Sequence, residues 1–177
     1  MTLEGTHIKL RALEPEDLEF VHQLENDEDL WHLSTTLTPY SKFVIKKYLE
    51  NANADIFEAK QLRLVICLKN ENIPIGLIDL FDFDPIHQRA GLGIVIYPKK
   101  HRSQGFGREV LEVILKYAFT HLPLQQLFAS VEIFNISSLK LFQSLGFVES
   151  GVRKKWNFHD GAWHDEVFLQ IFKDSIA

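Results

Sequence analysis

The sequence predicts an α+β fold with one mixed, mostly antiparallel sheet of about seven strands flanked by about four helices. Two observations lead to this prediction. Segments with the pattern of strands follow one another across short turns, which is typical of antiparallel neighbours. Helical patterns separate only some of these strands, so the regular alternation of a doubly wound fold is missing.

Composition limits the class of protein. The chain has 177 residues, which is most economically one domain spanning residues 1–177. A net charge of −5 argues against a general nucleic-acid binder. No apolar run approaches the length of a membrane span, and the N-terminus lacks a signal pattern. Cys67 is the only cysteine, so no internal disulfide can form. We expect a cytoplasmic protein without nucleic-acid or membrane partners.

The first half of the chain should contain two helices and three strands. Pro15 can occupy the first position of one helix, and Ser41 precedes the apolar pattern of the other. Residues 31–38 between these helices are expected to form a loop. The expected strands lie near residues 7–12, 62–69 and 73–83.

The second half should contain two further helices and the remaining strands. A helix over 105–121 is stopped by Pro123, and a helix over 136–145 has Gly146 as its left-handed cap. Expected strands lie at 89–97, at 126–134 and in a terminal hairpin that turns at Asp160-Gly161.

A basic loop joins strand 89–97 to helix 105–121. It contains Lys99, Lys100, Arg102 and Arg108, and the first acidic residue after the start of the loop is Glu109. The first turn of a helix offers free N–H groups and a dipole that favours negative charge, and glycines let a phosphate approach the main chain. The segment therefore predicts a phosphate-bearing ligand. It lacks the Gly-Lys-Ser/Thr of a P-loop and the third glycine of a dinucleotide fingerprint.

The pattern Arg102-x-x-Gly105-x-Gly107 matches the Q/R-x-x-G-x-G/A loop of the GNAT acetyltransferases, which holds the pyrophosphate of acetyl-CoA. Other segments resemble the same superfamily in a consistent order over residues 5–173. They are Ile8–Asp17, Pro74–Leu80, Arg89–Ile96, and Asn135–Ser138 followed by Leu145–Phe147. The ending Asp160–Val167 is similar to the hairpin of the branch that contains ribosomal-protein N-terminal and spermidine/diamine acetyltransferases. The resemblance implies a GNAT fold and acetyl-CoA as cosubstrate.

The resemblance also implies which residues bind acetyl-CoA. The strand at 94–96 would offer main-chain hydrogen bonds to the pantetheine, and strand 126–134 would splay away to admit it. Residues 102–108 would cradle the pyrophosphate. Helix capping explains Asn135 equally well, and packing explains Leu141 and Phe142 more simply. The expected binding residues are Ile94, Val95, Ile96, Arg102, Ser103, Gln104, Gly105, Phe106, Gly107, Arg108, Asn135, Ser138, Leu141 and Phe142.

Phe142 departs from the family, because many members have there a tyrosine that protonates the leaving thiolate. The proton must then come from Ser138, from water or from another group. A base is needed as well, since an alkylammonium has no lone pair. The candidates are Glu132, Asp79 and Asp82, of which Glu132 is favoured near the end of its strand. An exposed strand carboxylate is the competing interpretation. The predicted catalytic residues are Ser138 and Glu132.

The predicted function is direct acetyl transfer from acetyl-CoA to a primary amine, either a peptide N-terminus, a polyamine or another small amine. Polyamine relatives carry acids at the positions of Leu37, Thr38 and Gly91, so the acceptor stays open. The acidic run at 25–29 could attract amines or simply be a solvated helix end.

Other classes of function are also weighed against an enzyme. His159 and His164 do not have a spacing that forces their imidazoles together, so no metal site is predicted. A CoA-binding regulatory module without turnover and a plain interaction domain remain alternatives to an enzyme. Assembly into a homo-oligomer is compatible with the sequence.

Overall fold

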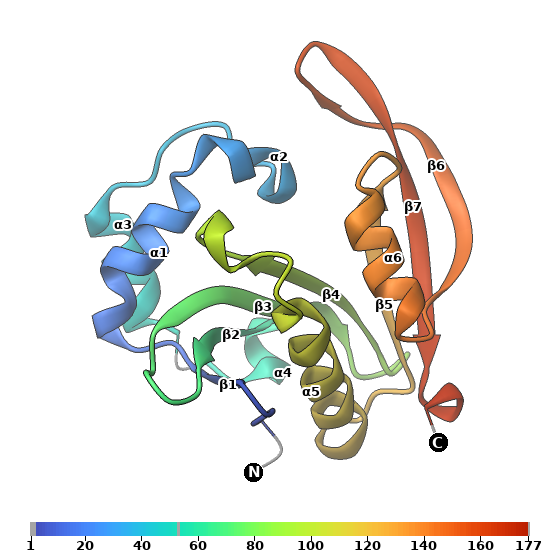
Figure 1. Ribbon diagram of the computed structural model, residues 1–177, viewed down its shortest axis with the longest axis horizontal. Helices are drawn as coiled ribbons and strands as arrows, with labels where there is room; N and C mark the ends of the chain where they lie inside the picture. Colours follow the sequence, from blue (N-terminus) through green and yellow to red (C-terminus); the bar gives the residue numbers. More distant parts are fainter. Residues whose placement is uncertain (1–2, 53, 177) are drawn as a thin grey trace.

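The computed structural model describes residues 3–52 and 54–176, and its centre is one seven-stranded sheet (Figure 1). The strand order is β1-β2-β3-β4-β5-β7-β6, and only β4 and β5 are parallel. This confirms the predicted α+β class with a mixed, mostly antiparallel sheet. The strands are β1 (Ile8–Ala12), β2 (Leu62–Leu68), β3 (Pro74–Asp84), β4 (Arg89–Ile96), β5 (Gln126–Glu132), β6 (Val148–His159) and β7 (Ala162–Phe172).

Four helices of eight residues or more accompany the sheet, in the places where the sequence predicts them. They are α1 (Leu18–Glu25), α3 (Lys42–Glu50), α5 (Phe106–His121) and α6 (Ile136–Ser144). Short 3-10 segments are η1 (Pro15–Asp17), η2 (Glu28–Leu30), η3 (Lys99–His101) and η4 (Lys173–Ser175). None of the helices within 3–52 and 54–176 is long and apolar enough to cross a membrane.

Two single-turn helices, α2 (Trp31–Ser34) and α4 (Ile56–Ala59), were not predicted. The expectation of a loop is therefore wrong over residues 31–34. One turn is too short to repeat an apolar stripe, so periodicity cannot reveal it. Thr35 adopts a left-handed conformation with φ of 55° and ends α2. Asp55 caps α4 through hydrogen bonds that its carboxylate accepts from two backbone N–H groups.

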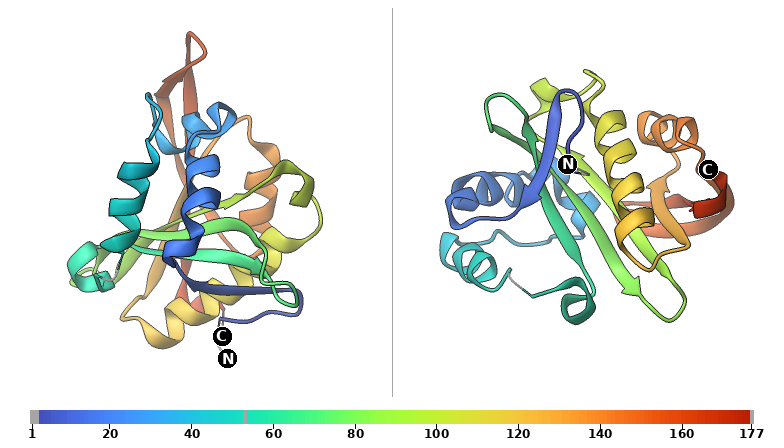
Figure 2. Two further views of the ribbon diagram at one scale, coloured as in Figure 1. Left: turned by 90° about the vertical axis from the view of Figure 1, so that its left-hand side faces the viewer. Right: turned by 90° about the horizontal axis from the view of Figure 1, so that it is seen from below.

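The β1–β4 part of the sheet is covered on both faces (Figure 2). Alternate residues of β2 point to opposite sides, so Leu64 and Ile66 pack in the cluster that includes α5, while Val65 and Cys67 pack with Leu24 of α1. Both faces of β2 are thus buried, which explains its nearly continuous apolar run.

The junction of β4 and β5 is short. Their parallel pairing runs only from Arg89 opposite Gln126 to Gly91 opposite Phe128. Beyond these pairs the two strands diverge, and the β6–β7 hairpin rises past the body of the molecule (Figure 1). The backbone of residues 92–96 keeps β3 as its partner on one side only.

Candidate active site

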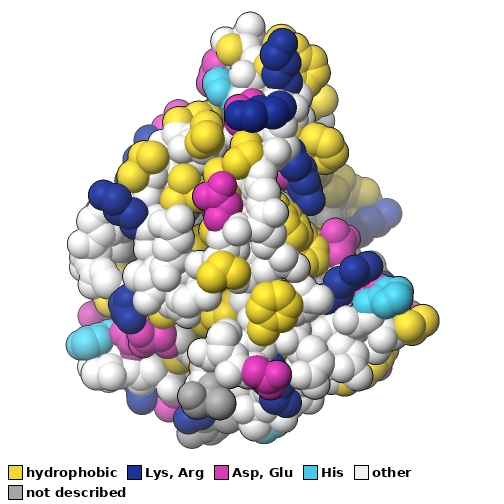
Figure 3. Space-filling view, turned by 90° about the vertical axis from the view of Figure 1, so that its right-hand side faces the viewer, with side chains coloured by type: hydrophobic (Ala, Val, Ile, Leu, Met, Phe, Trp, Pro, Cys, Tyr) yellow, Lys and Arg dark blue, Asp and Glu magenta, His cyan; other side chains and the backbone are white. Residues whose placement is uncertain are grey.

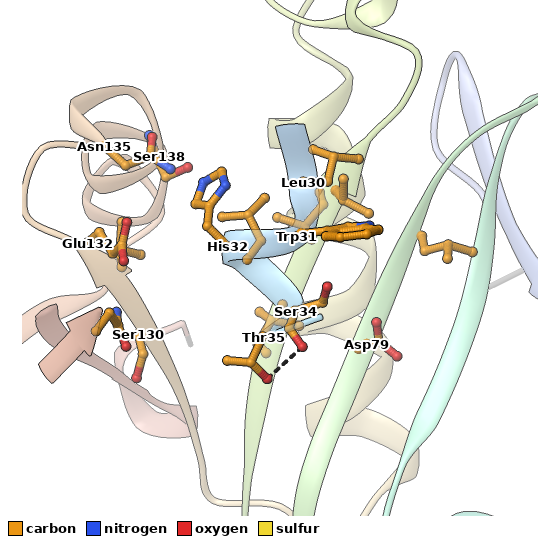
Figure 4. A pocket seen from close by; sticks show the side chains of 18 of the residues that line it. Leu30, Trp31, His32, Ser34, Thr35, Asp79, Ser130, Glu132, Asn135 and Ser138 are labelled. Atoms are coloured by element: carbon orange, nitrogen blue, oxygen red, sulfur yellow. Dashed lines mark hydrogen bonds between the residues drawn. The ribbon is translucent and has the colours of Figure 1, made fainter. Parts of the chain in front are cut away.

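A cleft with two connected parts lies where β4 and β5 diverge. We call the part of about 430 Å³ beside the α5 N-terminus the loop groove. We call the part of about 320 Å³ between α2, β3, β5 and β7 the carboxylate chamber (Figure 4). The residues that line both parts are Leu30, His32, Leu33, Ile94, Val95, Asn135 and Ser138.

The loop groove is built for an anion. Ser103 and Gly105 have positive φ values of 59° and 85°, and they turn the chain directly into α5. The N–H groups of a first helical turn have no intrahelical acceptor, and the helix dipole favours negative charge there. Arg102 and Arg108 line the groove; the Nε of Arg102 also donates to the carbonyl of Ile96 at 3.0 Å, which ties the loop to β4.

Most of the residues predicted to bind the cofactor meet at this groove. Those that line it are Ile94, Val95, Ile96, Arg102, Ser103, Gly105, Gly107, Arg108, Asn135, Ser138 and Leu141. Three others do not. The Gln104 amide folds back to donate to the carbonyl of Lys100 at 2.6 Å, Phe106 packs against the core, and Phe142 lines the carboxylate chamber instead.

Asn135 and Ser138 lie at the passage between the two parts of the cleft. The side-chain oxygen of Asn135 accepts a hydrogen bond from the Ser138 N–H at 3.2 Å, so the predicted cap of α6 is present. Both side chains also line the groove and the chamber (Figure 4). Asn135 therefore caps α6 and lines the cleft at the same time.

Phe142 is one helical turn beyond Ser138 and is almost fully buried. Its ring packs edge-on against Phe147 with centroids 5.0 Å apart. Ser138 therefore has a hydroxyl group on the same face of α6 as Phe142, whose ring has none.

Glu132 lies in the wall of the carboxylate chamber. Its side chain is buried, and both of its carboxylate oxygens are 3.0 Å from the Nε2 of His159. The competing interpretation of an exposed strand carboxylate is therefore wrong, because β7 and His159 cover this end of β5.

A second buried carboxylate, Glu166, stands directly opposite Glu132 on β7. It accepts hydrogen bonds from the Nη1 of Arg153 at 3.0 Å and from the Nδ2 of Asn157 at 3.1 Å. Like charges at opposite positions of two strands are unfavourable, so each carboxylate needs the partner that β6 supplies.

The opposite wall of the chamber contains an ion-pair network around Arg63. Its Nε donates to Asp79 at 2.7 Å and its Nη1 donates to Glu25 at 2.9 Å. Asp79 is therefore held by a cation, which weakens its candidacy as the base. Asp82 is exposed on an irregular stretch of β3 and lines neither part of the cleft.

The acidic run at 25–29 is mostly engaged in internal contacts. Asp27 accepts the N–H of Asp29 at 3.0 Å, and Asp29 pairs with Lys99. Only Glu25 of this run lines the carboxylate chamber.

Residues 7–148 match the family model described as an acetyltransferase (GNAT) domain. The chain belongs to the GNAT acetyltransferase family. It is 32% identical over 172 residues to spermidine N(1)-acetyltransferase of Vibrio cholerae, with 96% of this chain and 95% of that protein covered. It is 24% identical over 176 residues to a putative ribosomal N-acetyltransferase of Bacillus subtilis, with 94% and 92% covered. The crystal structure of the Vibrio cholerae spermidine N-acetyltransferase with CoA and spermine aligns with a TM-score of 0.85 at 29% identity and covers 97% and 99%.

This GNAT acetyltransferase is thus an enzyme that uses acetyl-CoA to acetylate amines, as the sequence predicts. The donor set of the loop groove fits the cosubstrate, because a basic helix N-terminus suits a pyrophosphate. Acetyl-CoA supplies the thioester, and the chain supplies the surfaces that align it with an amine.

The resembled polyamine acetyltransferases have an acid at the position of Gly91, and a side chain here would require the ring of Phe81 to move. A Cβ at Gly91 would lie 2.2 Å from the ring of Phe81, which itself packs edge-on against Phe128. The absence of the acid at this position is therefore coupled to the aromatic packing between β3 and β5.

Sequence reasoning missed several residues of the cleft. His32 and Leu33 of α2 line both of its parts, and Glu166 and Asn157 line the chamber. The hairpin turn at Asp160-Gly161 was predicted from the sequence, but the pairing of β7 with β5 is long-range and leaves no local pattern.

Proposed function

We propose that this acetyltransferase modifies a primary amine of a polyamine or a similar small cation, which binds in the carboxylate chamber. The observation that supports this is the charge of the chamber. Four carboxylates, those of Glu25, Asp79, Glu132 and Glu166, line it. The guanidiniums of Arg63 and Arg153 pair with three of them, so negative charge remains in excess. A cation in this chamber would lie beside the passage to the loop groove, where the thioester must be.

In this proposal Glu132 is the general base. An alkylammonium must lose a proton before its nitrogen can attack, and the buried carboxylate of Glu132 can accept that proton directly or through one water. Ser138 donates a proton to the leaving thiolate at the passage, because Phe142 has no hydroxyl. Alignment of amine and thioester adds the larger part of the rate, since well-oriented reactions gain roughly 7–11 kcal/mol.

The loop groove would hold acetyl-CoA in two ways. The N–H groups at the start of α5, with Arg102 and Arg108, would bind the pyrophosphate. The backbone of Ile94 to Ile96, which has no strand partner on its β5 side, would bind the pantetheine amides in the manner of an added strand.

Two comparisons favour a polyamine over a peptide N-terminus as acceptor. The relative with the printed name spermidine N(1)-acetyltransferase is 32% identical, whereas the putative ribosomal acetyltransferase is 24% identical. The Vibrio cholerae enzyme was also crystallised with spermine. Leu37, Thr38 and Gly91 stand where the resembled polyamine enzymes have acids, so the carboxylates of the chamber would replace those acids here.

We also propose that the protein assembles into a homo-oligomer. The Vibrio cholerae enzyme has a dodecameric structure. In this chain the hairpin exposes Trp156, Phe158 and Trp163 by 57%, 60% and 60%. Apolar side chains and basic side chains lie next to each other on that part of the surface (Figure 3). Large exposed aromatic side chains of this kind are typical of protein contacts.

The test measures thiol release from acetyl-CoA with spermidine, spermine and a peptide with a free N-terminal serine or alanine. We expect turnover with the polyamines, and a Glu132→Gln variant should lower kcat by about 100-fold while KM for acetyl-CoA stays within twofold. Glu149→Gln, which changes an exposed glutamate of β6, is the matched control. Turnover of the peptide without turnover of either polyamine would assign the enzyme to N-terminal acetylation instead.

A further inference from the structure

His159 lies between the buried carboxylate of Glu132 and the exposed carboxylate of Asp160. It is the last residue of β6, and its Nε2 lies 3.0 Å from both carboxylate oxygens of Glu132. Its Nδ1 lies 3.0 Å from a carboxylate oxygen of Asp160 in the hairpin turn. The side chain of Glu132 is 9% exposed and lines the chamber, whereas that of Asp160 is 92% exposed.

The other neighbours of His159 hold the ring without competing for its nitrogens. The ring of His164, from β7, stacks on it with centroids 4.1 Å apart. The ring of His32, from α2, is 5.3 Å away, and that of Phe134 packs against it edge-on at 6.0 Å. The charged or titratable groups around His159 are therefore Glu132, Asp160, His164 and His32.

Acetylation of an alkylammonium by acetyl-CoA gives an amide, CoA thiol and one proton. That proton must leave Glu132, whose side chain is buried, in every turnover. We propose that His159 is a positioning residue that orients Glu132 and carries this proton from Glu132 to Asp160 and the solvent. The inference rests on the proposed role of Glu132 as the base.

The relay moves one proton from the ammonium to water in four transfers. The ammonium N–H bond breaks and an O–H bond forms on Glu132. The carboxyl group then gives this proton to the Nε2 of neutral His159, which becomes an imidazolium. The imidazolium loses its Nδ1 proton toward Asp160, from which it passes to water. Once the products have left, water in the chamber takes the Nε2 proton while Nδ1 regains one from solvent, so the starting tautomer is restored and Glu132 is again a carboxylate.

The electrostatics around the ring agree with this role. The hydrogen bond with Asp160 raises the pKa of His159, burial opposes the rise, and Glu132 adds to it. A raised pKa makes the imidazole a better acceptor for the proton that leaves Glu132.

The first experiment uses steady-state kinetics with acetyl-CoA and spermidine between pH 5.5 and 9. His159→Gln keeps a hydrogen-bond donor but cannot titrate, so kcat should fall about 10- to 100-fold while KM for acetyl-CoA stays within twofold. In the parent enzyme kcat should rise with pH through the pKa of His159, because the neutral ring accepts the proton. This rise of kcat with pH should be absent in His159→Gln. In His159→Ala, added imidazole should restore part of kcat.

His87→Gln is the matched control, since His87 is exposed between β3 and β4 and lines neither part of the cleft. Its kcat should stay within about twofold and keep the rise with pH. Equal kcat and an unchanged pH profile in His159→Gln would overturn the relay. A loss in His159→Gln that imidazole does not rescue in His159→Ala would leave only orientation of Glu132, and so would overturn the proton-carrying role.

A second measurement does not depend on turnover. NMR titration of the His159 ring in the free enzyme should show that Glu132→Gln and Asp160→Asn each lower its pKa, because each removes a negative partner. If neither substitution changes the pKa of His159, the coupling of His159 to Glu132 and Asp160 is refuted, whether or not the enzyme turns over spermidine. An enzyme that is inactive on spermidine but shows both NMR shifts would contradict the proposed acceptor and leave the charge link of His159 intact.

Discussion

At the level of single residues, the proposed mechanism assigns thiolate protonation to one of two positions one helical turn apart in α6. Ser138 should donate the proton, so Ser138→Ala should lower kcat about tenfold and change KM for acetyl-CoA less, which is the pattern of a transition-state interaction. Ser175→Ala, an exposed serine in η4, serves as the control in the same thiol-release assay. Unchanged kinetics in Ser138→Ala would identify water as the proton source.

The second position is Phe142, whose buried ring lines the carboxylate chamber. Phe142→Tyr adds a hydroxyl at the place where many family members have one, and kcat should rise. The double variant Ser138→Ala/Phe142→Tyr should recover most of the activity that Ser138→Ala loses, since the two hydroxyls do the same work. If the double variant is as slow as Ser138→Ala, position 142 does not reach the thiolate.

Two glycines of the loop groove should respond differently to valine. Gly107 lies in α5 with only the end of the Leu141 side chain near its Cβ position, at 3.3 Å, so Gly107→Val should weaken CoA binding with little loss of stability. Gly105 has φ of 85°, so Gly105→Val should also destabilise the fold, by about 1 kcal/mol or more. Thermal shift with and without CoA measures both effects. Full stabilisation of Gly107→Val by CoA would contradict the anion cradle.

At the scale of elements, Asp17 fixes the start of α1 to the end of β1. Its buried carboxylate accepts two hydrogen bonds from Arg11, both at 2.8 Å, and one from the Glu14 N–H at 2.8 Å. Burial alone would raise the pKa of Asp17, but the hydrogen bonds from Arg11 and Glu14 outweigh it and hold the pKa below its ordinary value.

The lowered pKa of Asp17 gives a pH dependence with a definite sign. The unfolded carboxyl binds protons more readily than the folded one, so its stabilisation is complete above about pH 4 and is lost as the pH falls through the folded pKa. Asp17→Asn should lower the free energy of unfolding at pH 7 by about 2–4 kcal/mol and flatten the acid limb. Glu16→Gln, at an exposed position, should do neither. Urea titrations at pH 7 and pH 3 test this.

The sequence could predict the elements that depend on local contacts, but not those that depend on long-range contacts. The loop at 102–108 and the cap at Asn135 could be predicted because each is determined by neighbours in the chain. The α2 turn was missed because four residues cannot show a period. The burial of Glu132 could not be predicted, since it depends on Glu166 and His159, which strand pairing brings together from distant parts of the chain.

At the scale of the whole molecule, the β1–β4 and β5–β7 parts of the sheet share only the short pairing between Arg89–Gly91 and Gln126–Phe128. The loop groove has walls from both parts, so CoA should tie them together. At 100 times its Kd, CoA should add about 2.7 kcal/mol to the free energy of unfolding. Hydrogen exchange should slow at the start of α5 and also in α6. Slowing in α5 alone would show that α6 takes no part in binding, and Gly107→Val should show neither effect.

During synthesis, the wall of the carboxylate chamber that contains Glu132 and Glu166 is completed only by β7. β7 is the last strand along the chain, yet it lies between β5 and β6 in the sheet. As the chain leaves the ribosome, β5 and β6 emerge before the strand that joins them, and an unpaired strand edge invites pairing with other chains. The carboxylates of Glu132 and Glu166 become neighbours only when β7 is inserted. A nascent chain arrested before β7 therefore lacks Glu166 and the β7 wall of the chamber, however complete its α5 and β1–β4 already are.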